Sequence, residues 1–322
     1  SWQIIMLLES LVNYISKSQI TKELIQRIKE NSEINLIGSN RYAKALIINS
    51  LAQNQNKNVL LISTSSELAY KWYGYFQSIN NSNNVMFYPP NEYLPYDIRT
   101  KSSEVEYIQL NVLTRLINKK NDHKNNIIIT TERALQPHLL NIDYFRKCNL
   151  NLRKGNIIEI KDLAYKLSEL GYIKEDITSI EGHWSRRGDI IDIYPVNNEV
   201  PIRIEFFDNI IDKIREYDPL TQRTLDNINN VEIVPVGFNL LIRKRLENLS
   251  EQNIFNSDEI TNKNNLDRYL GIIEEYPSNI IDYIHENTII IIDEIDDCNK
   301  FSKNWFIESN NNFEQYKDEI AN

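Results

Sequence analysis

The chain has 322 residues, 41% of them hydrophobic, and a formal net charge of −9 at pH 7. This length suits about two domains, each able to bury a core. The acidic balance argues against a broad electrostatic contact with DNA phosphates, although it leaves room for a local basic patch. Cys148 and Cys298 lie far apart without further ligands at metal spacing, so we interpret them as reduced thiols of a cytoplasmic protein.

The first residues predict helices and no membrane anchor. The apolar run at residues 4–8 is too short to span a bilayer, and no basic residues precede it as they would in a secretory signal. Leucines and isoleucines recur at helical spacing within residues 1–31. We therefore expect a helical start and no contact with membranes.

A possible nucleotide-binding loop follows. Residues 34–37 predict a short buried strand, Gly38 a turn, and residues 43–53 a helix, which is where a P-loop would lie. Gly38, Ser39 and Lys44 are the candidate positions. A functional loop requires a second glycine and a hydroxyl residue directly after the lysine, whereas alanine follows here. We interpret the loop as degenerate and inactive.

The next hundred residues alternate between strands and helices. Near-continuous apolar strands that alternate with helices are typical of a parallel sheet flanked by helices. The predicted strands lie at residues 59–62, 85–88 and 127–131, and the predicted helices at 67–79, 103–118 and 132–140.

The pattern changes near residue 150 to an extended run, a short helix and an antiparallel unit over residues 183–224. Arg187, Gly188 and Asp189 predict a turn, and Asn197–Asn198 offer positive φ for a second one. Residues 201–207 alternate, which separates three buried apolar positions from Arg203, Glu205 and Phe207. We expect this unit to present one surface with four binding candidates: Arg186, Arg187, Arg203 and Phe207.

These residues carry a family resemblance. The runs RGDIIDIYP (187–195), PIRIEFFDNIIDKIR (201–215) and DPLTQRT (218–224) resemble the module shared by the N-terminal parts of UvrB and of Mfd, the transcription-repair coupling factor. Residues 88–96 are similar to a loop of the same family. The resemblance implies that the module binds UvrA, the damage-recognition ATPase of nucleotide excision repair. The family's contact positions fall on Arg187, Arg203 and Phe207.

On the residues alone, a second interpretation of these positions stays open. Arg203 can pair with Asp192 or a neighbouring acid across the hairpin, which would stabilise the sheet by at most about 1 kcal/mol. Phe207 can belong to the core. The interface interpretation rests on the prominence of arginine and aromatic residues in binding hot spots.

The remaining residues lead back to the first sheet. Residues 288–292 predict a buried strand that ends at Asp293–Glu294, the place of a Walker B acid pair. Without a phosphate loop, we interpret this pair as a cap of the following helix. The layout predicted is a discontinuous, degenerate UvrB-like α/β domain (residues 1–148 and 234–322) around an inserted small α+β domain (149–233), as the resemblance also implies.

No residue set predicts catalysis or a metal site. The four histidines are isolated, and no nucleophile elbow occurs. The basic run at residues 243–245 suits a solvated helix face, with weak phosphate contact as the alternative.

The resemblance implies a function through partners. A chain of this kind recruits UvrA, while regions outside these residues bind RNA polymerase and use ATP and Mg²⁺ to translocate on double-stranded DNA. The segment itself would hold no cofactor. Two alternatives remain: the first half of a UvrB-like excinuclease ATPase, identified by nucleotide binding at the Gly38 loop, and a DNA-binding helicase fragment, identified by salt-sensitive affinity for duplex DNA.

Overall fold

The structure is a computed structural model that describes residues 10–30, 33–79, 84–91, 102–118, 125–251, 266 and 270–320. The apolar run at residues 4–8 and most of the loop at residues 88–96 lie outside the described residues. Among the helices that are described, none combines the length and the apolar character that crossing a bilayer requires.

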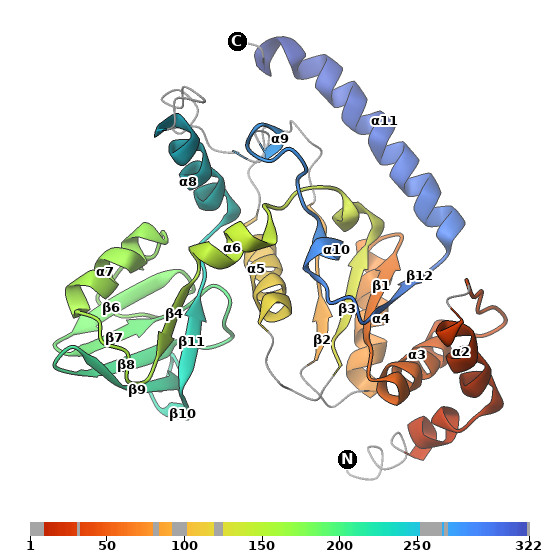
Figure 1. Ribbon diagram of the computed structural model, residues 1–322, viewed down its shortest axis with the longest axis horizontal. Coiled ribbons are helices and arrows are strands. Elements are labelled where there is room, and N and C mark those ends of the chain that lie inside the picture. The colour runs from red at the N-terminus through yellow and green to blue at the C-terminus, as the bar shows by residue number, and fades with distance from the viewer. Residues whose placement is uncertain are drawn as a thin grey trace. The chain divides into compact units, whose positions relative to one another are not determined.

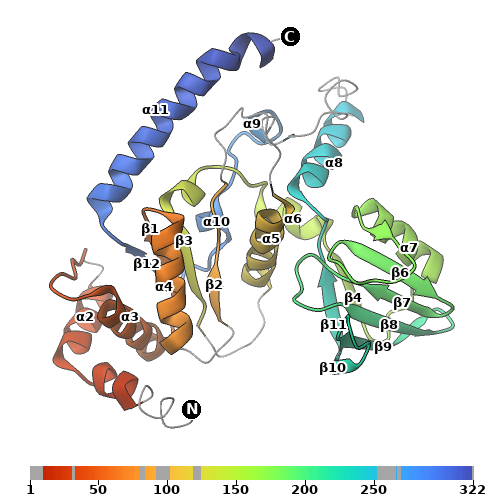
Figure 2. The same cartoon turned by 180° about the vertical axis from the view of Figure 1, so that it is seen from behind.

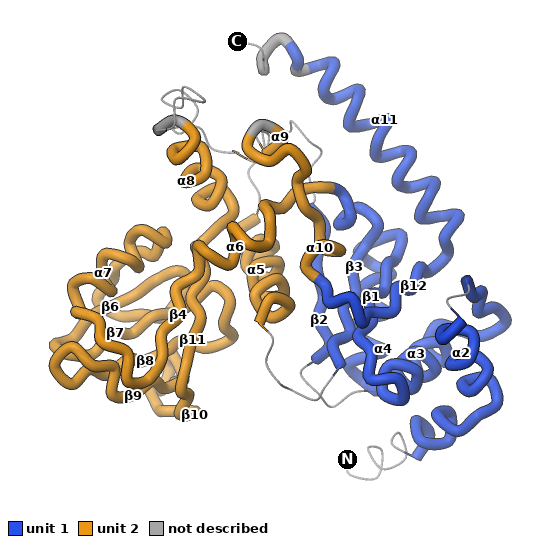
Figure 3. Tube along the Cα trace, viewed as in Figure 1, with its two compact units in different colours: residues 1–94, 119–136, 284–322 blue, residues 95–118, 137–283 orange. Residues whose placement is uncertain are grey.

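The chain divides into two compact units, coloured separately in Figure 3. Unit 1 contains residues 1–94, 119–136 and 284–322, and unit 2 contains residues 95–118 and 137–283. This division differs from the predicted boundaries, because unit 2 includes helices on both sides of the predicted insert. The predicted ends of the inserted domain, at residues 149 and 233, therefore stay a prediction.

Unit 1 is built on a parallel sheet (Figure 1). Its four strands pair in the order β12-β1-β3-β2, each parallel to its neighbour. They are β1 (Asn58–Ser63), β2 (Val85–Phe87), β3 (Ile127–Thr131) and β12 (Thr288–Ile292). The predicted parallel sheet with flanking helices is therefore confirmed.

Helices α3 (Arg41–Gln55) and α4 (Ser66–Ile79) form one apolar cluster with this sheet (Figure 2). Their inward residues, such as Ala45, Trp72 and Phe76, are almost fully buried against strand residues such as Val59. The unit also contains α2 (Gln19–Lys29), the 3-10 helix η1 (Glu132–Leu135) and α11 (Ile295–Ile320). The helix predicted over residues 132–140 is thus only the short η1.

The strand predicted at residues 34–37 is wrong. Residues 33–37 form no regular structure, and the Ile37 side chain is 85% exposed. Ile34 and Leu36 instead pack on the helix pair α2–α3, beside Leu24 and Ile47. A run of four apolar residues is too short to tell a strand from an extended segment that packs on helices.

Unit 2 is built on a six-stranded sheet with strand order β10-β9-β8-β7-β6-β5, antiparallel except for β5 and β6. Its strands are β5 (Ile173–Lys174), β6 (His183–Arg187), β7 (Ile190–Ile193), β8 (Ile202–Phe207), β9 (Ile210–Tyr217) and β10 (Thr224–Ile228). A two-stranded sheet joins β4 (Leu150–Arg153) to β11 (Asn230–Ile233). The helices of the unit are α5 (Ser103–Ile117), α6 (Ile142–Cys148), α7 (Ile160–Glu169), α8 (Phe238–Glu251), α9 (Leu270–Ile273) and α10 (Ile280–Tyr283).

The six-stranded sheet has an inner and an outer face. On the inner face, Ile202, Ile204 and Phe206 of β8 join Leu163 and Leu167 of α7 in one buried core. Side chains alternate along a strand, so the remaining β8 residues lie on the opposite, outer face. Helix α7 therefore packs on the inner face and does not cover the outer face.

Positive φ angles occur in the turns before β7 and after β8. The predicted turn before β7 is confirmed, with Gly188 at φ +60°. The positive φ expected at Asn197 and Asn198 does not occur. Asn197 is buried, and its Nδ2 donates to the Glu232 carbonyl oxygen at 2.9 Å. Asp208, between β8 and β9, takes φ +54° instead.

Candidate partner-binding surface

Strand register places three of the four predicted binding residues on the outer face. Arg203 lies opposite Asp192 on β7 and opposite Arg215 on β9. Residues directly opposite in a sheet share a face. The rows of the outer face are, in order, Ser185–Asp192–Arg203–Arg215, then Arg187–Ile190–Glu205–Lys213, then Phe207–Ile210.

Arg186 lies on the other face, contrary to the prediction that all four candidates share one surface. It pairs with Ile191, whose side chain belongs to the inner core. Its Nε donates to the Gly188 carbonyl oxygen at 3.0 Å, which ties it to the turn. Adjacent strand residues alternate between faces, so Arg186 and Arg187 cannot both serve the outer one.

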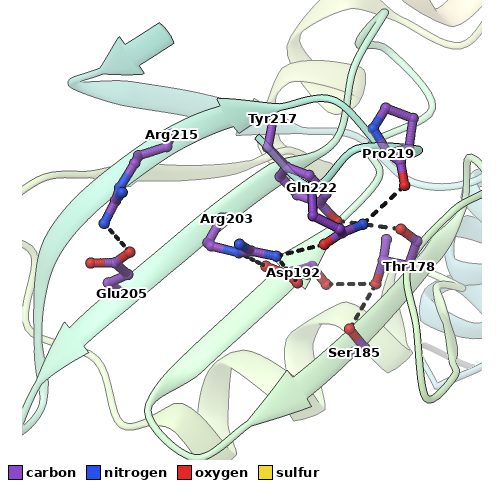
Figure 4. Close-up of polar contacts among 9 residues, drawn as sticks. All are labelled: Thr178, Ser185, Asp192, Arg203, Glu205, Arg215, Tyr217, Pro219 and Gln222. Atoms are coloured by element: carbon purple, nitrogen blue, oxygen red, sulfur yellow. Dashed lines mark hydrogen bonds and ion pairs between the residues drawn. The ribbon is translucent and has the colours of Figure 1, made fainter. Parts of the chain in front are cut away.

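Arg203 is held firmly by its neighbours (Figure 4). Its Nε donates to Asp192 Oδ1 at 2.8 Å, and its Nη2 donates to Asp192 Oδ2 and to Gln222 Oε1, both at 2.9 Å. Its Cζ lies 4.6 Å from the ring centroid of Tyr217. Hydrogen bonding to Asp192 raises the pKa of the Arg203 guanidinium. The interpretation that Arg203 pairs across the hairpin is therefore confirmed.

This pairing still leaves Arg203 able to bind. Its side chain is 23% exposed, whereas that of Asp192 is 5% exposed. Within the described part of the chain, no hydrogen bond uses Arg203 Nη1, which carries two N–H donors. Structural pairing and partner binding are therefore compatible at this residue.

A buried polar network on the same face adjoins the Arg203–Asp192 pair. Thr178 Oγ1 donates to the Asp192 carbonyl oxygen at 3.2 Å and hydrogen bonds Ser185 Oγ at 3.0 Å. The Tyr217 hydroxyl donates to the Thr178 carbonyl oxygen at 3.3 Å, and burial raises the pKa of that phenol. Satisfied networks of this kind fix side chains in one position.

Phe207 and Arg187 are the open members of the surface. The Phe207 side chain is 72% exposed, which excludes the interpretation that it belongs to the core. Glu205 accepts a hydrogen bond from Arg215 and lies 3.9 Å from Lys213 Nζ, so these charges are partly satisfied within the sheet. Among the described residues, none forms an ion pair with Arg187, which is exposed.

The DPLTQ run at residues 218–222 forms a turn that supports Arg203. Asp218 Oδ1 accepts from the backbone N–H groups of Leu220 and Thr221 at 2.9 and 2.7 Å, and the Thr221 bond lowers the pKa of Asp218. Gln222 follows at φ +60° and reaches Arg203. An Asp–Pro pair signals such a turn, but not the residue that the turn serves. Gln222 and Tyr217 were therefore missed as supports of Arg203.

An ion pair joins the start of α3, just after the Gly38 turn, to the end of β12. Asp293 is buried, and its Oδ2 accepts from Arg41 Nε at 2.9 Å and from Trp72 Nε1 at 2.8 Å. Asp293 raises the pKa of Arg41. The carboxylate that would hold Mg²⁺ in a Walker B pair is thus occupied by a guanidinium and an indole.

The other candidate positions near this loop lie apart from such chemistry. Gly38 takes φ +83° and is exposed, as is Ser39, while Lys44 lies in the first turn of α3. Glu294 is exposed, with its Oε1 4.0 Å from Arg41 Nη2. The capping role of the Asp293–Glu294 pair stays a prediction, while Asp293 Oδ2 is used by Arg41 and Trp72.

Comparison with known proteins finds a family match for the residues that carry this surface. A family model described as UvrB interaction domain matches residues 150–237, from β4 to just beyond β11. Arg187, Arg203 and Phe207 all lie within this match. Residues 150–237 are therefore similar to a UvrB interaction domain.

The whole chain is similar to transcription-repair-coupling factors. It is 27% identical over 317 residues to that of Bacillus subtilis (strain 168), a match that covers 89% of this chain and 26% of that protein. It is also 27% identical to those of Staphylococcus epidermidis RP62A (88% and 26% covered) and Staphylococcus aureus MRSA252 (83% and 25% covered). The chain thus spans about a quarter of the length of the curated relatives it matches.

Proposed function

We propose that this chain is part of a transcription-repair coupling factor and that it recruits UvrA through the outer face of the six-stranded sheet. The observation that carries the proposal is the exposed Phe207 ring on the same face as Arg187, which has no ion pair among the described residues, and the anchored Arg203, all within the residues that match the UvrB interaction domain. The relatives' name supports a role between transcription and repair.

The geometry suits an acidic protein partner. Phe207 supplies apolar area that leaves water on binding, and Arg187 and Arg203 Nη1 donate to carboxylates on the partner. Arg203 is already held by Asp192 and Gln222, so little side-chain entropy is lost when it binds. The net charge of −9 favours this local patch for protein contact rather than for DNA.

Other activities of the whole protein would lie outside this segment. Contact with RNA polymerase and ATP-driven movement on double-stranded DNA belong to the regions of the coupling factor beyond the quarter that this chain matches. The cytoplasm is the compartment in which transcription and repair meet in bacteria, and it is the proposed location.

We expect the chain to bind no nucleotide. Arg41 and Trp72 both hydrogen bond to Asp293 Oδ2, which competes with Mg²⁺ for this carboxylate, and residues 33–37 before the Gly38 turn form no strand. Titration of the chain with Mg²⁺–ATP in a calorimeter should give only heats of dilution. Saturable binding at micromolar nucleotide would contradict this expectation and favour a UvrB-like ATPase.

The interaction with UvrA is tested by charge reversal at Arg187. We expect Arg187→Glu to weaken the affinity for purified UvrA by about 10- to 100-fold, because an acid would then face the partner's carboxylates. Binding is measured by surface plasmon resonance with the folded chain immobilised. Arg187 is exposed, so the fold should not change.

Lys166→Glu provides the matched control. Lys166 is exposed on α7, the helix that packs on the inner face. The same change of charge there should leave UvrA affinity within about twofold of wild type, because the helix stands on the far side of the sheet. Equal losses in both variants would show a general charge effect and would contradict the assigned surface.

A further inference from the structure

An exposed isoleucine outside the strands continues the Phe207 row. Ile157 forms an isolated antiparallel bridge with Ile210 at the start of β9. On either side of this bridge, Ile158 N donates to the Asn209 carbonyl oxygen at 2.8 Å and Ile211 N donates to the Asn156 carbonyl oxygen at 2.9 Å. Residues opposite in this pattern lie close together on one face. Ile210 in turn lies opposite Phe207.

These three side chains form one apolar strip, defined as Ile157, Ile210 and Phe207. They are 80%, 43% and 72% exposed. Single exposed apolar residues are ordinary on a protein surface, whereas adjacent ones mark sites of interaction. The strip crosses the end of the outer face, next to the row that contains Arg187.

The backbone presents the strip rigidly. Gly155 takes φ +85°, and its N–H donates to the Ile211 carbonyl oxygen at 2.8 Å. Asn156 Oδ1 accepts from Arg153 N at 2.7 Å. This turn holds Ile157 in place before any partner arrives, which lowers the entropic cost of binding.

We propose that Ile157 and Ile210 extend Phe207 into the apolar centre of the UvrA contact, so that the strip meets an aliphatic patch on UvrA. This inference rests on the proposed function. Arg187, Glu205 and Lys213 lie in the neighbouring row and form a charged rim, the arrangement of an apolar centre with a polar border that interfaces share. The strip also lies wholly within the residues that match the UvrB interaction domain.

The occupant is UvrA rather than a second copy of this chain. Two copies joined through the strip would bring together two chains that each carry a net charge of −9. This charge opposes self-association. A partner with carboxylates around an aliphatic patch satisfies the rim and the strip together.

The test compares UvrA affinity for wild type, Ile157→Ser and Ile157→Leu. We expect the serine variant to bind about tenfold more weakly and the leucine variant to bind nearly as wild type, because only the first removes apolar area. The tenfold loss should be the same in 0.1 M and 0.5 M salt, whereas the loss from Arg187→Glu should shrink, because salt screens charges.

Ile173→Ser is the matched control, since Ile173 is a half-exposed isoleucine on β5 at the other edge of the sheet. It should bind UvrA as wild type does. Wild-type affinity in Ile157→Ser would overturn the strip and leave the proposed function standing. A wild-type chain that binds no UvrA would overturn both. A wild-type dimer that Ile157→Ser converts to a monomer would overturn UvrA as the occupant.

Discussion

Replacement of Asp192 with alanine is expected to lower the free energy of unfolding of the six-stranded sheet by about 2 to 3 kcal/mol. The Asp192 carboxylate is almost fully buried and accepts two hydrogen bonds from Arg203. Loss of one partner from such a pair leaves the other charge poorly solvated, which costs about 3 to 5 kcal/mol when both are fully buried. We expect less here because Arg203 is partly exposed and keeps Gln222 and Tyr217.

The measurement is hydrogen exchange of the β7 and β8 amides in the whole chain. Amide exchange measures the stability of this sheet by itself, which matters because the two compact units can unfold separately. Asp212→Ala is the matched control, because Asp212 is half-exposed on β9 and lies 3.9 Å from Lys213 Nζ. It should change stability by less than about 0.5 kcal/mol. Equal effects of the two variants would show that the Arg203–Asp192 pair is not a structural element.

Local patterns in the sequence predicted the faces of β8 and the parallel sheet of unit 1. Period-two alternation from Ile202 to Phe207 and the apolar run of β1 are both properties of a few adjacent residues. The same kind of signal failed at residues 34–37. There, the apolar residues were satisfied by helices α2 and α3, a choice that depends on packing far along the chain.

The support of the surface could not be predicted for a related reason. Arg203 is held by Gln222, which lies 19 residues later, and Asp293 by Arg41, which lies 252 residues earlier. Ile210 pairs with Phe207 on one side and with Ile157 on the other, and Ile157 belongs to no strand. From the sequence alone, a structural role and an interface role were alternatives at Arg203. The structure allows both, because Nε and Nη2 bind within the sheet while Nη1 forms no hydrogen bond among the described residues.

Phe207→Ala should cause the largest loss of UvrA affinity among single substitutions on the outer face, about 100-fold. That factor corresponds to about 2.7 kcal/mol, within the range of aromatic hot spots. The ring stands 72% exposed, so most of its area is available to leave water on binding. The same exposure means that the stability of the free chain should change by less than about 0.5 kcal/mol.

Two further variants separate the ring from general apolar area. Phe207→Leu keeps part of the area but no ring, and we expect an affinity between those of wild type and Phe207→Ala. Tyr165→Ala removes an exposed aromatic residue from α7, on the inner side of the sheet, and should leave UvrA binding unchanged. The affinities are measured by isothermal titration with UvrA. If folded Phe207→Ala bound UvrA as tightly as wild type, the ring would not be at the contact, and the outer face would lose its role as the recruiting surface.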